Sequence, residues 1–182
     1  MAFNENTRVK IPTILHLCSL GYEYLPLSKA KWDVNTNIFS EIFEESMRKL
    51  NPNMEAADFR ILLDSINLAL DNEDLGKSFY EILTNTSGHT LIDFQNFKNN
   101  TLHVVTELPC INGDEEFRPD ITLLVNGLPL VFIEVKTRYT RDYGTPEDAV
   151  TYRKQARIRN IARVYLYVNK LWEVNCRFDV IA

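Results

Sequence analysis

The chain has 182 residues and a net charge of −5, with 45% hydrophobic and 25% charged residues, a composition typical of a globular domain. No apolar run approaches the roughly 18 residues that cross a bilayer, and the N-terminus lacks an apolar signal core, so we expect no membrane contact and a cytoplasmic location. Three dispersed cysteines and three single histidines argue against a disulfide framework and a zinc site.

The first half of the chain has apolar residues at helical spacing. This pattern predicts helices over 10–19, 37–50, 55–70 and 75–83. Pro12 fits the first turn of the first helix, and Gly21 is a plausible signal for its end. We therefore expect residues 1–86 to be mainly helical.

After residue 88 the apolar pattern alternates instead. Strands are predicted over 89–94 and 101–108, followed by an acidic turn at 113–116 and a hairpin within 117–139. Thr145, Pro146 and Asp148 form a helix start with a capping box, which predicts a helix to about residue 160 and then strands over 161–168 and 171–181. The expected fold class is α/β, with an antiparallel hairpin at its centre.

The hairpin carries charges where apolar residues would favour stability. Asp120 stands before the first strand, while Glu134 and Lys136 share one face of the second. Two carboxylates suit Mg²⁺ or Mn²⁺, and a lysine can orient water or neutralise phosphate charge. The alternative is an ordinary hairpin with one solvated face.

This site makes a geometric demand on the hairpin. A strict two-residue Asn126-Gly127 turn would set Asp120 opposite Ile133, and so place Asp120 and Glu134 on opposite faces. We therefore expect either a three-residue loop with Gly127 in the left-handed region or a bulge in the ladder.

Charge is unevenly distributed along the chain. Between Lys136 and Arg177 there are 10 basic and 4 acidic residues, and the remainder carries 10 basic and 21 acidic ones. This asymmetry is compatible with a basic face for nucleic acid or with a merely solvated basic helix.

The hairpin also resembles a known family. The resemblance is to the N-terminal nuclease domain of the type I restriction enzyme R subunit (HsdR), of the PD-(D/E)xK superfamily. It rests on Arg118-Pro119-Asp120-Ile121, on the Asn-Gly-Leu-Pro-Leu run at 126–130 and on Ile133-Glu134-Val135-Lys136, with "SLGYEYLP", "FEESMRKLNP" and "LHVVTELP" extending it over most of the chain.

The resemblance implies a restriction-endonuclease-like mixed sheet flanked by helices, in one nuclease domain over 1–182 whose sheet-containing core is 87–182. It implies a catalytic Lys136 and a Mg²⁺ site, with Mn²⁺ as a substitute. The implied metal ligands are Asp120, Glu134, the Val135 carbonyl and Glu5.

The family also has a Gln-x-x-x-Tyr motif on the following helix. Gln155 matches it, but Arg159 stands at the tyrosine position, which puts stacking by that residue in doubt. Arg138 and Arg157 complete the expected DNA contacts. Implied partners are double-stranded DNA and, through the full-length subunit, the methyltransferase and specificity subunits.

No phosphate-binding loop of the Gly-x-x-x-x-Gly-Lys-Ser/Thr type occurs. We expect ATP to act only through motor domains that this chain does not contain. The leading hypothesis is therefore a Mg²⁺-dependent endonuclease domain of a type I restriction–modification R subunit. A catalytically silent docking module of the same complex and a stand-alone PD-(D/E)xK nuclease are the alternatives.

Overall fold

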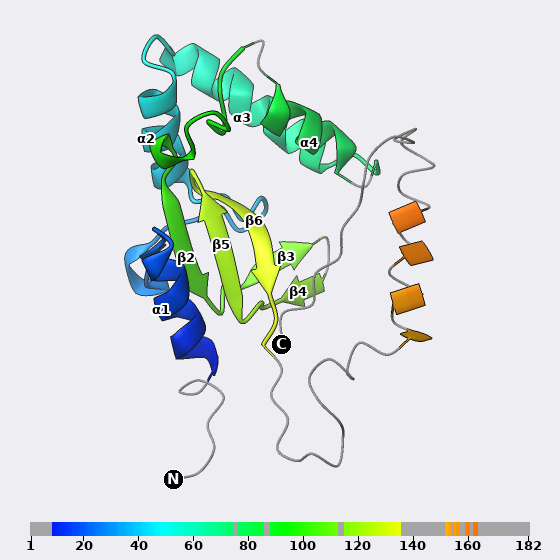
Figure 1. Ribbon diagram of the computed structural model, residues 1–182. Helices are drawn as coiled ribbons and strands as arrows, with labels where there is room; N and C mark the ends of the chain where they lie inside the picture. Colours follow the sequence, from blue (N-terminus) through cyan, green and yellow to red (C-terminus); the bar gives the residue numbers. More distant parts are fainter. Residues whose placement is uncertain are drawn as a thin grey trace, which may run out of the picture. The chain divides into compact units, whose positions relative to one another are not determined.

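The computed structural model describes residues 9–74, 76–85, 88–112, 115–135, 152–153, 155–156, 159–160 and 162–163. The chain divides into two compact units, 1–135 and 136–182. Elements of the first unit are labelled in Figure 1, and the described residues of the second are all helical. Within these ranges, no helix has both the length and the apolar character needed to cross a bilayer. The single domain with parts 1–86 and 87–182 stays a prediction.

Helices form in the first unit where the helical spacing predicted them. They are α1 (Ile11–Ser19), α2 (Ser40–Leu50), α3 (Ala56–Leu70) and α4 (Lys77–Thr84), with short 3₁₀ turns at Leu27–Lys29 and Phe97–Asn99. Pro12 lies in the first turn of α1, and Gly21, at φ +104°, ends that helix because its backbone adopts a conformation that side chains disfavour. A capping box between Glu55 and Asp58 begins α3.

The strands form a mixed four-stranded sheet and a separate small hairpin. The sheet has the order β1 (Glu23–Tyr24), β2 (Leu102–Thr106), β5 (Ile121–Val125) and β6 (Leu128–Ile133). β1 runs parallel to β2, whereas the β2–β5 and β5–β6 pairs are antiparallel. The small hairpin pairs β3 (Cys110–Asn112) with β4 (Glu115–Phe117). The expected α/β class is confirmed.

Three local expectations were wrong. Residues 89–94 do not form a strand, because side chains rather than a ladder bind their backbone: Asn126 Nδ2 donates to the Leu91 carbonyl, and Asn100 Oδ1 accepts from Asp93 N–H. The acidic stretch predicted as a turn contributes β4. The strand expected from residue 161 is contradicted at 162 and 163, which are helical, whereas 145–148 and 171–181 lie outside the described residues.

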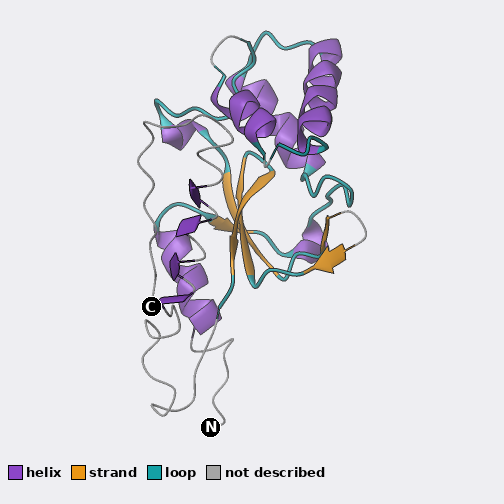
Figure 2. Ribbon diagram, turned by 90° about the vertical axis from the view of Figure 1, so that its right-hand side faces the viewer, coloured by secondary structure: helices purple, strands orange, loops and turns teal. Residues whose placement is uncertain are grey.

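The sheet is covered on both faces at β5, whereas β6 has exposed residues. Every residue of β5 is buried. Leu17 of α1 packs with Val104, Ile121 and Leu123 on one face, and Phe39 packs with Val105, Leu108 and Leu124 on the other. Figures 1 and 2 show α2, α3 and α4 together at one end of the sheet, with α1 beside the other end. Asp120 is at the α1 end, where β5 begins and β6 finishes.

Candidate metal centre

The register of the β5–β6 hairpin decides whether Asp120 and Glu134 can meet. Val125 pairs with Leu128 and Leu124 with Pro129, so the turn has two residues, and both Asn126 and Gly127 have positive φ. The next pair is Leu123 with Val131. Leu130 is therefore an extra residue on β6, which is a β-bulge. The three-residue loop was wrong, and the alternative of a bulge is confirmed.

The bulge shifts the register of the hairpin by one residue. Beyond it the ladder runs to the pair Ile121–Ile133, and continuing this register by one position would set Asp120 opposite Glu134. Directly opposed residues project from the same face of an antiparallel pair. The Glu134 side chain is exposed at this end of the sheet.

Asp120 is held by contacts to both carboxylate oxygens. Its Oδ2 accepts a hydrogen bond from the Val135 N–H at 2.8 Å, and its Oδ1 lies 3.1 Å from the Lys10 ammonium, with a quarter of its side chain exposed. The Asp120 carbonyl accepts a hydrogen bond from the Glu107 N–H at 3.3 Å. The Asp120 carboxylate is thus oriented by the Lys10 ammonium on one oxygen and by the Val135 N–H on the other.

Lys10 and Glu107 are site residues that sequence reasoning missed. Lys10 precedes α1 and is only 8% exposed. Its Nζ lies 2.5 Å from Glu107 Oε1, which comes from the segment after β2. Glu107 has φ +56°, a left-handed conformation uncommon for residues other than glycine. The one available signal was weak: a lysine directly before the apolar run of α1.

The charge on Lys10 is stabilised despite its burial. Desolvation opposes the ammonium form, but hydrogen bonds to Glu107 and Asp120 and the charges of both carboxylates outweigh it and raise the pKa of Lys10 above its ordinary value. Lys10 is therefore a cation at neutral pH.

The remaining candidates divide between the two units. Val135 lies beside Glu134, and its side chain is buried against Leu17 and Ile121. Gln155 and Arg159 are exposed helical residues of the second unit. Arg159 has its guanidinium carbon 5.8 Å from the centre of the Tyr152 ring. Four candidates lie outside the described residues: Glu5, Lys136, Arg138 and Arg157.

The donor set fits a hard divalent cation. Mg²⁺ uses one or two carboxylates and keeps several waters, a number of carboxylates that Asp120 and Glu134 together would supply. Asp120 already attracts a cationic group, the Lys10 ammonium. No group of three or more His, Cys, Asp or Glu side chains suited to a metal gathers within the described ranges.

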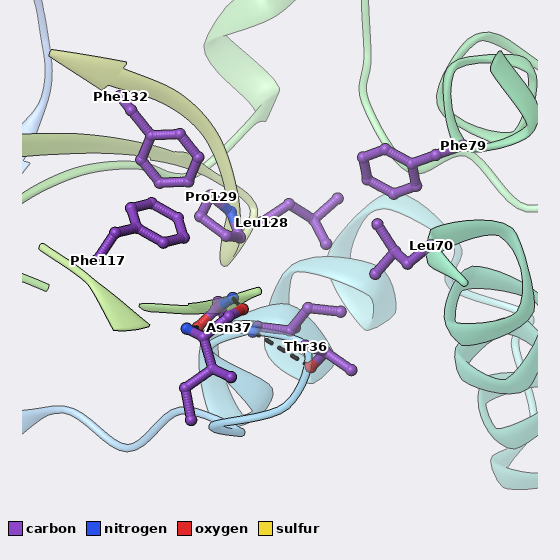
Figure 3. A pocket seen from close by; sticks show the side chains of 10 residues that line it. Thr36, Asn37, Leu70, Phe79, Phe117, Leu128, Pro129 and Phe132 are labelled. Carbon is purple, nitrogen blue, oxygen red and sulfur yellow. Dashed lines mark hydrogen bonds between the residues drawn. The ribbon is translucent and has the colours of Figure 1, made fainter. Parts of the chain in front are cut away.

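A pocket of about 300 Å³ lies elsewhere in the first unit (Figure 3). Leu128, Pro129 and Phe132 of β6 line it from one side, and Leu70 and Phe79 from the helices. Phe117 meets Phe132 edge to face, with ring centres 5.5 Å apart. None of its lining residues is acidic or basic, so the pocket lacks the groups that hydrolysis requires.

Comparison with known proteins shows which family the sequence matches. A family model described as the type I restriction enzyme R protein N terminus matches residues 2–177. The type I restriction enzyme HindI endonuclease subunit of Haemophilus influenzae is 31% identical over 161 residues, covering 73% of this chain and 15% of that subunit.

Other relatives are UPF0102 proteins. One from Lachnoclostridium phytofermentans is 52% identical over 63 residues, which are 34% of this chain and 52% of the relative. Another from Clostridium perfringens is 33% identical over 109 residues, covering 60% of this chain and 72% of the relative. The chain spans about half the length of the first curated relatives it matches.

Proposed function

The chain belongs to the family of the type I restriction enzyme R protein N terminus, and from this premise we propose that it is a Mg²⁺-dependent endonuclease domain that hydrolyses DNA phosphodiester bonds. The observation that supports the proposal is the bulged register of β5 and β6. Continued by one position beyond the Ile121–Ile133 pair, this register would set Asp120 opposite Glu134. A hairpin without the bulge would have separated these carboxylates.

In the proposed reaction, the metal ion and the residues of the chain have separate roles. If bound, Mg²⁺ would supply a water of lowered pKa and would neutralise charge on the phosphate. Asp120, oriented by the Val135 N–H, and Glu134 would hold the ion, with the Val135 carbonyl as a further ligand. Lys136 has the role of the catalytic lysine, which stabilises the negative charge that develops on the phosphate.

DNA and the other subunits are the proposed partners. The exposed Gln155 and Arg159 contact double-stranded DNA, and arginine does so as a phosphate ligand. The methyltransferase and specificity subunits join through the full-length R subunit, whose motor domains use ATP. Mn²⁺ substitutes for Mg²⁺, and the protein acts in the cytoplasm.

The test is nicking of supercoiled plasmid by the purified chain in Mg²⁺ and in Mn²⁺. Asp120→Asn, Glu134→Gln and Lys136→Met should each lower the nicking rate by more than about 100-fold, since even groups that only support a metal ligand cost about 10–100-fold when removed. The matched control is Glu73→Gln, an exposed acid of the α3–α4 connection, which should leave the rate unchanged.

Nicking that needs no metal, or that survives all three site substitutions, would contradict the proposal. A chain that binds DNA but cuts none, alone or within the full-length subunit, would instead favour the catalytically silent docking function.

A further inference from the structure

The buried ammonium of Lys10 is the least expected group at the candidate metal centre. Lysine is almost never buried unless its charge is paired, and here the pairing involves two carboxylates from different elements. Glu107 Oε1 lies at 2.5 Å and Asp120 Oδ1 at 3.1 Å. The side chain of Lys10 is 10% exposed, compared with 52% for that of Glu107.

This arrangement uses both oxygens of Asp120. Oδ1 faces the ammonium and Oδ2 accepts the Val135 N–H. Each carboxylate oxygen still has a second lone pair, so a divalent cation can bind. Any ion bound to Asp120 would nevertheless lie close to the positive charge of Lys10, and like charges repel more strongly in a partly buried site than in water.

Of the two carboxylates that pair with Lys10, only that of Asp120 is a proposed metal ligand. Asp120 lies at the hairpin end beside Glu134, whereas Glu107 follows β2. Glu107 makes the shorter contact with the ammonium. Lys10 can therefore keep Glu107 as its partner when Asp120 turns to a metal ion.

We propose that Lys10 is a positioning residue of the metal centre, a tethered counter-cation that neutralises Asp120 when no metal is bound and competes with the divalent ion for that carboxylate. This inference rests on the proposed function. Lys10 is not a catalytic residue, because its ammonium is paired with two carboxylates and its side chain is only 10% exposed.

The first test measures Mn²⁺ affinity by electron paramagnetic resonance of free Mn²⁺ in solutions of the 182-residue chain. Lys10→Met keeps the apolar stem and removes the charge, so its Kd should be on the order of tenfold lower than that of the wild type, within the usual range of coupling between competing groups. Lys10→Arg keeps the charge and should bind Mn²⁺ as the wild type does. Asp120→Asn should abolish Mn²⁺ binding, both as a single substitution and in combination with Lys10→Met.

The second test uses the unmodified chain and therefore does not depend on the folding of a variant. Lysine acetylation is followed by mass spectrometry with and without Mn²⁺. Mn²⁺ should increase labelling of Lys10 because the ammonium leaves Asp120. Lys31, which pairs with Glu41 at the surface, is the internal control and should be labelled equally in both conditions.

The outcomes separate the two proposals. Mn²⁺ binding that depends on Asp120, combined with unchanged affinity in Lys10→Met and unchanged labelling of Lys10, would overturn the role of Lys10 and leave the nuclease standing. Absence of Mn²⁺ binding in both the wild type and Lys10→Met would overturn the metal centre and the role of Lys10 together.

Discussion

At the scale of single residues, Asn126 connects the hairpin to the rest of the first unit. Its side chain is fully buried. The amide nitrogen donates to the Leu91 carbonyl and to Asn100 Oδ1, both at 2.8 Å, and Oδ1 accepts the Thr101 N–H at 2.7 Å. Asn126 therefore has a structural role within the Asn-Gly-Leu-Pro-Leu run: it positions the strands that carry Asp120 and Glu134.

Replacing Asn126 by alanine should lower the free energy of unfolding by about 3 kcal/mol, because the substitution leaves buried backbone groups without partners. Urea denaturation followed by circular dichroism measures this change. Asn53→Ala, at an exposed position, is the control and should change stability by less than about 0.5 kcal/mol. A loss below about 1 kcal/mol for Asn126→Ala would show that the network contributes little.

At the scale of elements, the turn of the hairpin packs against the beginning of α2. The Phe39 N–H donates to the Gly127 carbonyl at 2.9 Å. A Cβ added to Gly127 would lie 2.7 Å from the Phe43 nitrogen and 2.8 Å from the Phe39 oxygen. Gly127 is thus required both for its positive φ and for the close approach of two backbones.

Gly76 provides a matched control for this contact. Both glycines have φ +82°, but a Cβ on Gly76 would meet nothing within 4 Å. Gly76→Ala should cost about 1–2 kcal/mol, which is the strain of the left-handed conformation. Gly127→Ala should cost more than about 3 kcal/mol, because rigid backbone must also move. Equal losses in thermal or urea unfolding would contradict the steric explanation.

At the scale of the whole molecule, basic and acidic residues are unevenly distributed along the chain. The net charge is −5, yet basic residues outnumber acidic ones by 10 to 4 between Lys136 and Arg177. Arg153, Arg159 and Arg163 are exposed helical residues in this part. If the chain acts on DNA as proposed, these basic residues would attract the phosphate backbone, which the acidic first unit repels.

The double substitution Arg153→Gln/Arg163→Gln should weaken DNA binding and reduce the slope of log K against log salt by about 2, because each lost phosphate contact releases about one counterion fewer. Fluorescence anisotropy at salt concentrations from about 50 to 200 mM measures the slope. Lys31→Gln/Lys77→Gln removes two charges from the first unit and should leave it unchanged. Equal slopes for all three proteins would exclude Arg153 and Arg163 as phosphate contacts.

Much of the first unit follows from local patterns in the sequence. Apolar spacing predicted α1 to α4, and alternation predicted β2, β5 and β6, because side chains a few residues apart determine which face is buried. Residues 89–94 were mistaken for a strand for the same reason. Asn100, seven residues from Asp93, and Asn126, 35 residues from Leu91, bind the backbone of this stretch in place of a neighbouring strand.

The candidate site likewise depends partly on local sequence and partly on tertiary packing. The sequence by itself determined the family resemblance, the hairpin and its two acids, since these depend on residues within one short segment. Only the tertiary structure decided that the β5–β6 hairpin has a bulge at Leu130, and that Lys10 reaches Glu107 across 97 positions of the chain. The contact between Lys10 and Glu107 forms because α1 packs against the sheet, and no local spacing of residues predicts it.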